Sequence, residues 1–150
     1  MKRAVLVVSL CLVVASVASP PPPADPNAPL LTGAQVDARV LGILRRSCAD
    51  CHSEATRYPW YSYVAPVSWL IRRDVVGGRK HLDFSHWNDY STVRKERLLS
   101  EIANQVKDRD MPLVEYTWIH RGTRLSEDEM KAVFAWTQKE RMRLITASAP

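Results

Sequence analysis

Two cysteines and a histidine stand close together in the run Cys48-Ala49-Asp50-Cys51-His52. On one helical turn, two thiols at this spacing can each reach one vinyl group of a haem and form a thioether. The histidine directly after the second thiol then presents its imidazole to the iron from the same side. The spacing therefore predicts one covalently attached haem c, with Cys48 and Cys51 as anchors and His52 as the proximal iron ligand.

Three other roles for the two thiols have less support in the sequence. A disulfide between Cys48 and Cys51 would close a very short loop and stabilise little. A thioredoxin-like redox pair needs a βαβ setting, which the surrounding sequence lacks. A zinc site needs four ligands, and His81, His86 or His120 could complete such a set, but no second closely spaced pair of ligands is present. Because four ligands are available but not in the usual two pairs, a zinc-stabilised binding module is kept as the second alternative function.

A low-spin electron carrier also needs a sixth iron ligand, and Met111 is the predicted one. It follows a polar run and precedes Pro112, which places it in a stiffened loop after a helix. Met130 and Met142 fall within a helical pattern, where core or surface roles are expected. His120 is the alternative sixth ligand. An open sixth position would instead indicate a haem enzyme or sensor, peroxidase-like or gas-binding.

The N-terminus has the three-part pattern of a secretory signal. Lys2 and Arg3 are followed by an apolar run over residues 4–15 and by the small residues 16–18. This run is shorter than the roughly 20 residues that a membrane-spanning helix needs. Residues 1–18 are therefore predicted to be a signal peptide, which places the protein in a bacterial periplasm. An uncleaved N-terminal anchor is the alternative, and it is the only predicted contact with a membrane.

The remaining chain divides into a linker and one domain. Residues 19–30 hold six of the ten prolines and are predicted to be an extended, polyproline-like linker. Residues 31–146 are the predicted folded domain, and 46% hydrophobic and 25% charged residues are ordinary values for one globular unit.

The charge of the chain bears on its partners. The net charge is +5, or 19 − 16 = +3 without Lys2 and Arg3 of the predicted signal, which is too weak and too scattered to indicate nucleic-acid binding. Basic groups at 72–73, 79–80 and 94–97 would, around a haem edge, steer an acidic redox partner protein.

Helical patterns recur along this domain. The T-x-x-Q run at 32–35 predicts the N-terminal cap of a helix that leads into Cys48, and the S-x-x-E run at 126–129 predicts the cap of a C-terminal helix. Apolar spacing predicts a further helix over 95–106, and Pro66 and Gly77 are expected to bound another. The fold prediction is all-α, with four or five helices around the haem. Core positions are expected for Trp60, Trp69 and Trp87.

Beyond the pentapeptide, the chain resembles the small exported haem-binding domain family, a branch of the c-type cytochromes defined by CxxCHS. The matching stretches are 48–53, 58–62, 65–69, 78–79, 84–87, 111–112, Tyr116, His120, 125–126 and Trp136. A helix leading into the haem motif, a Met-Pro loop and a capped C-terminal helix also follow the order seen in class I cytochromes c. The resemblance implies haem attachment and electron transfer. The expected function is thus that of a monohaem c-type cytochrome that carries one electron and is not an enzyme.

Overall fold

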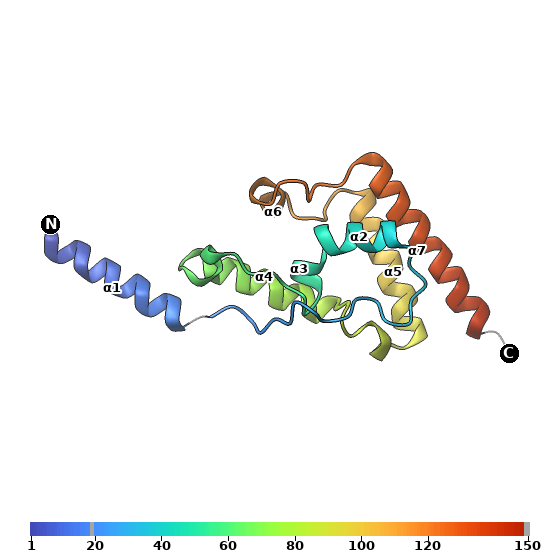
Figure 1. The fold of residues 1–150 in the computed structure, drawn as a ribbon, viewed down its shortest axis with the longest axis horizontal. Helices are drawn as coiled ribbons and strands as arrows, with labels where there is room; N and C mark the ends of the chain where they lie inside the picture. The colour runs from blue at the N-terminus through green and yellow to red at the C-terminus, as the bar shows by residue number, and fades with distance from the viewer. Residues whose placement is uncertain (19, 149–150) are drawn as a thin grey trace.

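The computed structural model describes residues 1–18 and 20–148, and within them all regular structure is helical (Figure 1). The elements are α1 (Lys2–Ala18), α2 (Ala38–Ser47), α3 (Ala49–His52), η1 (Trp60–Tyr63), α4 (Val67–His81), η2 (Trp87–Asp89), α5 (Thr92–Lys107), α6 (Val114–Ile119) and α7 (Glu127–Ser148), where η denotes a 3-10 helix. The prediction of an all-α single domain is confirmed. The predicted number of helices is too low, because α3 and α6 span only 4 and 6 residues and leave no periodic pattern.

The hydrophobic core forms mainly where α5 packs along α7 (Figure 1). The buried side chains of α5 are Leu98, Leu99, Ile102, Ala103 and Val106, so the predicted apolar face is confirmed. At the start of α7, the Ser126 amide donates to Glu129 Oε2 at 2.9 Å, and the Glu129 amide donates to Ser126 Oγ at 3.3 Å. This reciprocal pair is the capping box that the sequence predicts.

The start of α2 differs from the prediction. The cap is Asp37, whose carboxylate accepts from the Val40 amide at 2.8 Å, so the capping box predicted at 32–35 is wrong. Gly33 has a φ of +84°, which belongs to a turn and not to a helix. The Gln35 carbonyl instead accepts a hydrogen bond from the Trp136 indole at 2.9 Å, which ties the segment before α2 to α7.

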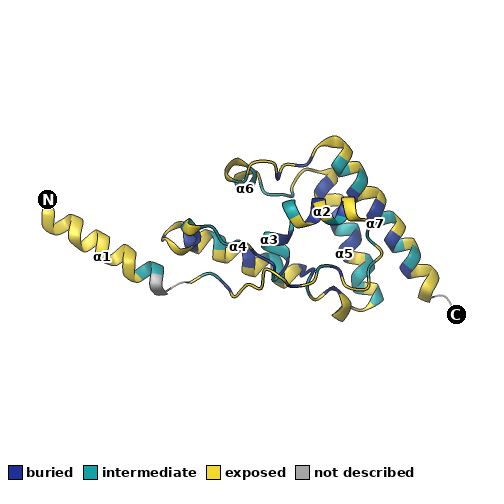
Figure 2. Cartoon of the chain, in the orientation of Figure 1, coloured by how far each residue is buried: buried dark blue, intermediate teal, exposed yellow. Residues whose placement is uncertain are grey.

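The α4 helix is longer than expected. It passes through Gly77 and ends at His81, so the predicted C-terminal cap at Gly77 is wrong. Trp87 is 1% exposed and lies in the core as predicted, but Trp60 and Trp69 are 77% and 48% exposed, against the prediction. The reason is that η1 and the first turns of α4 extend beyond the core of α5 and α7 (Figure 2).

The N-terminal helix α1 projects away from the other helices (Figure 1). Among the described residues, no helix is both long enough and apolar enough to cross a membrane. Residues 20–30 run along the domain, where Arg79 Nη1 donates to the Pro23 carbonyl at 2.7 Å and the Asp25 amide donates to the Glu54 carbonyl at 2.8 Å. The predicted cleavage point adjoins residue 19, which lies outside the described residues, and the predicted domain boundaries stay predictions.

Candidate cofactor site

The C-x-x-C-H motif forms a single turn at the end of α2. Burial of Val40, Ile43 and Leu44 fixes α2 against the core, and Cys48 stands between α2 and α3. The Cys48 carbonyl then accepts from the amide of Cys51 at 3.2 Å and from that of His52 at 3.0 Å. The side chains of the motif therefore extend from one compact piece of backbone.

The His52 ring is held by two carbonyl groups of α4 and its C-cap. Nδ1 lies 3.2 Å from the Gly78 carbonyl oxygen and 3.1 Å from that of Leu82. Carbonyl oxygens only accept, so Nδ1 carries the hydrogen and the lone pair of Nε2 is available for a metal. Burial lowers the pKa of His52, so the ring is neutral at physiological pH. A neutral imidazole whose second nitrogen donates to a carbonyl is the usual state of a metal-ligating histidine.

The two thiols stay protonated. Burial raises the pKa of Cys48 and of Cys51 to about 12 in each case, because an apolar environment disfavours the thiolate. Both are unpaired cysteines. They are therefore available as thiols for addition to an alkene.

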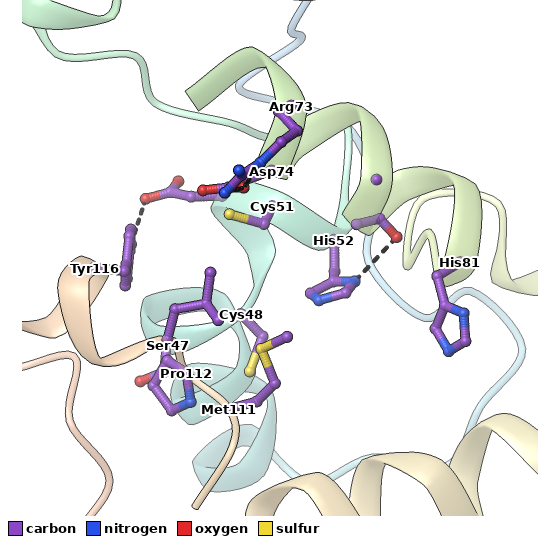
Figure 3. A pocket seen from close by; sticks show the side chains of 14 residues that line it. Ser47, Cys48, Cys51, His52, Arg73, Asp74, His81, Met111, Pro112 and Tyr116 are labelled. Carbon is purple, nitrogen blue, oxygen red and sulfur yellow. Dashed lines mark hydrogen bonds and ion pairs between the residues drawn. The ribbon is translucent and has the colours of Figure 1, made fainter. Parts of the chain in front are cut away.

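Two adjoining cavities, of about 320 and 340 Å³, lie beside the motif. Cys48, His52, His81 and Met111 line both, and Cys51 lines the first (Figure 3). The walls of the second cavity are mainly apolar, from Leu44, Leu82, Phe84, Leu98, Ile102 and Val106. The cavities thus offer an apolar space next to two thiols, the imidazoles of His52 and His81, and the Met111 thioether.

Met111 reaches this space from the loop after α5. The amides of Asp110 and Met111 donate to the Gln105 carbonyl at 3.0 and 3.2 Å, which ties the loop to the last turn of α5. Beyond the loop, the Tyr116 hydroxyl donates to Asp50 Oδ2 of the motif at 2.7 Å (Figure 3). Burial, and then this hydrogen bond, raise the pKa of Tyr116. Both ends of the Met111 segment are therefore fastened to the elements that form the cavities.

His120 lies in a different place. Its Nε2 is 3.0 Å from the Tyr61 hydroxyl, its Nδ1 is 3.0 Å from the Tyr116 carbonyl, and its ring stacks on Tyr116 with 4.1 Å between centroids. It lines a cavity of about 360 Å³ to which Cys51 contributes but Cys48, His52 and Met111 do not. The structure therefore brings Cys48, Cys51, His52 and Met111 together and leaves His120 outside the group.

Gly78 and Arg79 contribute to the site through contacts that the sequence analysis does not predict. Gly78 packs so closely on the motif that an added Cβ would lie 2.4 Å from the Cys51 carbonyl oxygen. Arg79 donates to the Ser53 carbonyl and to Thr56 Oγ1, both at 2.8 Å, and so fixes the chain just after the motif. The pair Gly77-Gly78 inside a helical pattern was the available signal for such a close approach.

A model of the haem-binding domain family matches residues 5–139. The chain belongs to this family. The predicted family is thereby confirmed. Among curated proteins, the haem-binding domain is similar to the cytochrome c peroxidase Ccp of Escherichia coli (strain K12), with 27% identity over 107 residues. That match covers 69% of this chain and 23% of the peroxidase, so the chain spans less than a quarter of the relative's length. No solved structure matches the chain.

The donor set of the haem-binding domain fits a haem and offers little to zinc. In residues 1–18 and 20–148, no three His, Cys, Asp or Glu side chains gather as metal ligands, whereas a structural zinc site needs four. Two thiols, an oriented imidazole, a thioether and apolar walls are instead the groups that a c-type haem requires.

Proposed function

We propose that this haem-binding domain is a monohaem c-type cytochrome that carries one electron outside the cytoplasm. The observation that supports it is that the side chains of Cys48, Cys51, His52 and Met111 line adjoining cavities with largely apolar walls. A bound haem supplies a one-electron iron couple.

The chain's own residues have distinct tasks in this proposal. The thiols of Cys48 and Cys51 would hold the cofactor, each by addition of S–H across one vinyl group. His52 would bind the iron through Nε2, because the carbonyls of Gly78 and Leu82 hold Nδ1 and so orient the ring. Met111 would supply its thioether sulfur as the second iron ligand from the protein, and a thioether ligand would raise the reduction potential. The apolar side chains exclude water, which also tunes the potential.

The test is the chemical state of the bound haem. The full chain is expressed with its N-terminal segment in a bacterium that matures c-type cytochromes, and the pyridine haemochrome spectrum and acid–acetone extraction are measured. We expect one haem per chain that stays with the polypeptide. Cys48→Ala and Cys51→Ala should each lower the holoprotein yield. Cys11→Ala is the matched control, because Cys11 is exposed on α1 and should leave haem content unchanged. Clean extraction of haem from the wild type would refute covalent attachment.

A haem enzyme is the second candidate, and the similarity to a cytochrome c peroxidase favours it. Such an enzyme needs an open iron position, so the Met111 loop would have to leave the cavity. Three results would support the enzyme. The ferric protein would lack the weak sulfur–iron absorption band at the red end of the visible spectrum, it would bind cyanide fast, and it would turn over with peroxide. A retained band and slow cyanide binding would support the carrier.

We propose that the protein is exported from the cytoplasm, because residues 1–18 have the three-part pattern of a secretory signal. N-terminal sequencing of the mature protein should give a start near residue 19. Recovery of Met1 in a membrane fraction would instead support an uncleaved anchor.

A further inference from the structure

The three basic groups of the sequence have different surroundings in the structure. Arg72 Nη1 donates to the Pro20 carbonyl at 2.9 Å, and Arg73 pairs with Asp74 at 3.0 Å. Arg79 is directed to the backbone and side chain next to the motif. Lys80, Arg94 and Arg97 stand together where α4 ends and α5 begins, and all three line one hollow.

These cations surround a hollow of about 400 Å³, here called the basic hollow. It is lined by Gly77, Lys80, His81, Arg94, Arg97 and Leu98, with no carboxylate among them. Lys80 makes no ion pair within the described part of the chain, and the Arg97 side chain is 63% exposed. Glu101 lies beside these cations with its side chain 37% exposed, and it pairs with His81 Nε2 at 2.9 Å and with Arg97 Nε at 3.7 Å. One carboxylate thus faces several cations, and the hollow keeps an excess of positive charge.

The basic hollow shares its inner wall with the candidate cofactor site. Gly77 and His81 also line the first cofactor cavity, and His81 and Leu98 also line the second. A molecule seated in the hollow is therefore separated from the cofactor cavities by single side chains. Such a short separation is what electron transfer between two proteins requires, and an excess of one charge steers the partner to that place.

We propose that the basic hollow is the docking surface for a redox partner protein that presents a cluster of Asp and Glu side chains. The proposal rests on the electron-transfer function above. Charge complementarity selects this occupant, because a carboxylate cluster would pair with Lys80, Arg94 and Arg97 at a wall that the hollow shares with the cofactor cavities. Arg94 is the least mobile of the three, since Nη2 donates to the His81 carbonyl at 3.0 Å and the guanidinium lies 4.9 Å from the Tyr90 ring centroid.

The test uses small redox probes of opposite charge. The reduced holoprotein is mixed in a stopped-flow instrument with hexacyanoferrate(III), an anion, or with tris(phenanthroline)cobalt(III), a cation. The variant is Lys80→Glu/Arg97→Glu, and Lys80→Gln/Arg97→Gln is a milder version in case the first folds poorly. The matched control is Lys131→Glu/Lys139→Glu, which makes the same change of net charge on exposed positions of α7.

At about 0.01 M ionic strength, we expect the hollow variant to react roughly ten-fold more slowly with the anion and faster with the cation than the α7 control does. The difference should vanish near 1 M salt, where the Debye length is only about 3 Å. A polyglutamate peptide should slow the anion reaction of the wild type and not that of the hollow variant. These rates report the charge of the basic hollow and do not require the partner protein.

Two results would overturn the proposal. Equal effects of the hollow and α7 variants would mean that only net charge matters. Loss of haem from both hollow variants, with normal haem in the control, would mean that these cations hold the carboxylates of the cofactor itself. Failure of the proposed function is distinguishable, because the wild type would then lack covalent haem or a reversible one-electron couple before any variant is made.

Discussion

Two neighbouring glycines of α4 allow a matched test of how the fold supports the cofactor motif. Gly78→Ala places a Cβ 2.4 Å from the Cys51 carbonyl oxygen, 3.1 Å from its carbon and 3.3 Å from the Cys51 Cβ. Gly77→Ala meets no atom within 4 Å. The two substitutions add the same methyl group to the same helix, so any difference between them reports the contact between α3 and α4.

The geometry sets the expected magnitude. Ordinary contact begins at 3.4 Å, so α4 must move about 1 Å away from the motif in Gly78→Ala. This movement stretches the hydrogen bonds from His52 Nδ1 to the carbonyls of Gly78 and Leu82, now 3.2 and 3.1 Å. Overpacking against backbone costs about 1–3 kcal/mol, and a weakened hydrogen bond about 1 kcal/mol. Replacing a helical glycine by alanine stabilises the folded protein by about 0.5–1 kcal/mol. We therefore expect the free energy of unfolding to fall by about 3 kcal/mol in Gly78→Ala and to rise slightly in Gly77→Ala.

Thermal unfolding followed by circular dichroism, together with haem content per chain, measures both effects. Gly78→Ala should unfold roughly 10 °C lower than the wild type and carry less haem. Gly77→Ala should unfold at or slightly above the wild-type temperature, because its added Cβ meets no atom of the protein within 4 Å. Equal stability and equal haem content in the two variants would show that the close approach of Gly78 to Cys51 is not needed.

Three further predictions concern the sixth ligand, a helix cap and a titrating histidine. Met111→Ala should abolish the red sulfur–iron band and lower the potential, whereas His120→Ala should keep the band; the reverse pattern in optical spectra would assign the ligand to His120. Ser126→Ala should lower the free energy of unfolding by about 1 kcal/mol in a denaturant titration, since it removes half of the capping box of α7. Hydrogen bonds to Asp89 first and Glu54 second raise the pKa of His86, so its NMR titration midpoint should lie above the usual range and fall in Asp89→Asn. A raised folded-state pKa stabilises the protein fully below the unfolded-state pKa, and this contribution is lost as the pH rises through the folded-state value.

The long helices were predictable because their side chains repeat. The apolar positions of α5 recur at helical spacing, and the S-x-x-E run at 126–129 specifies its own cap through two local hydrogen bonds. Both signals depend on residues within a few positions of one another, and a single sequence contains them completely. The same reasoning failed at 32–35, because α2 begins only at Ala38 and Asp37 is its cap. The Gln35 carbonyl accepts instead from Trp136, a partner about a hundred residues away.

The exposed tryptophans show a second limit. Trp60 and Trp69 are large and apolar, so burial is the expected outcome for each residue on its own. Their exposure follows from the position of η1 and the first turns of α4 beyond the core, which is a property of the tertiary arrangement (Figure 2). No local pattern in residues 60–69 distinguishes them from Trp87, which is buried.

The candidate site combines both kinds of information. The motif supplies the ligand types, since thiols, imidazole and spacing are all present in five consecutive residues. The orientation of the His52 ring depends on the backbone carbonyls of Gly78 in α4 and of Leu82 at its C-cap. Every residue has such a carbonyl, so the sequence alone does not indicate these contacts. At Gly78 the residue type does reflect this contact, because only a residue without a side chain lets α4 come close enough to hold the ring. Substitutions that disturb haem binding without touching a ligand should therefore concentrate on the face of α4 that meets the motif.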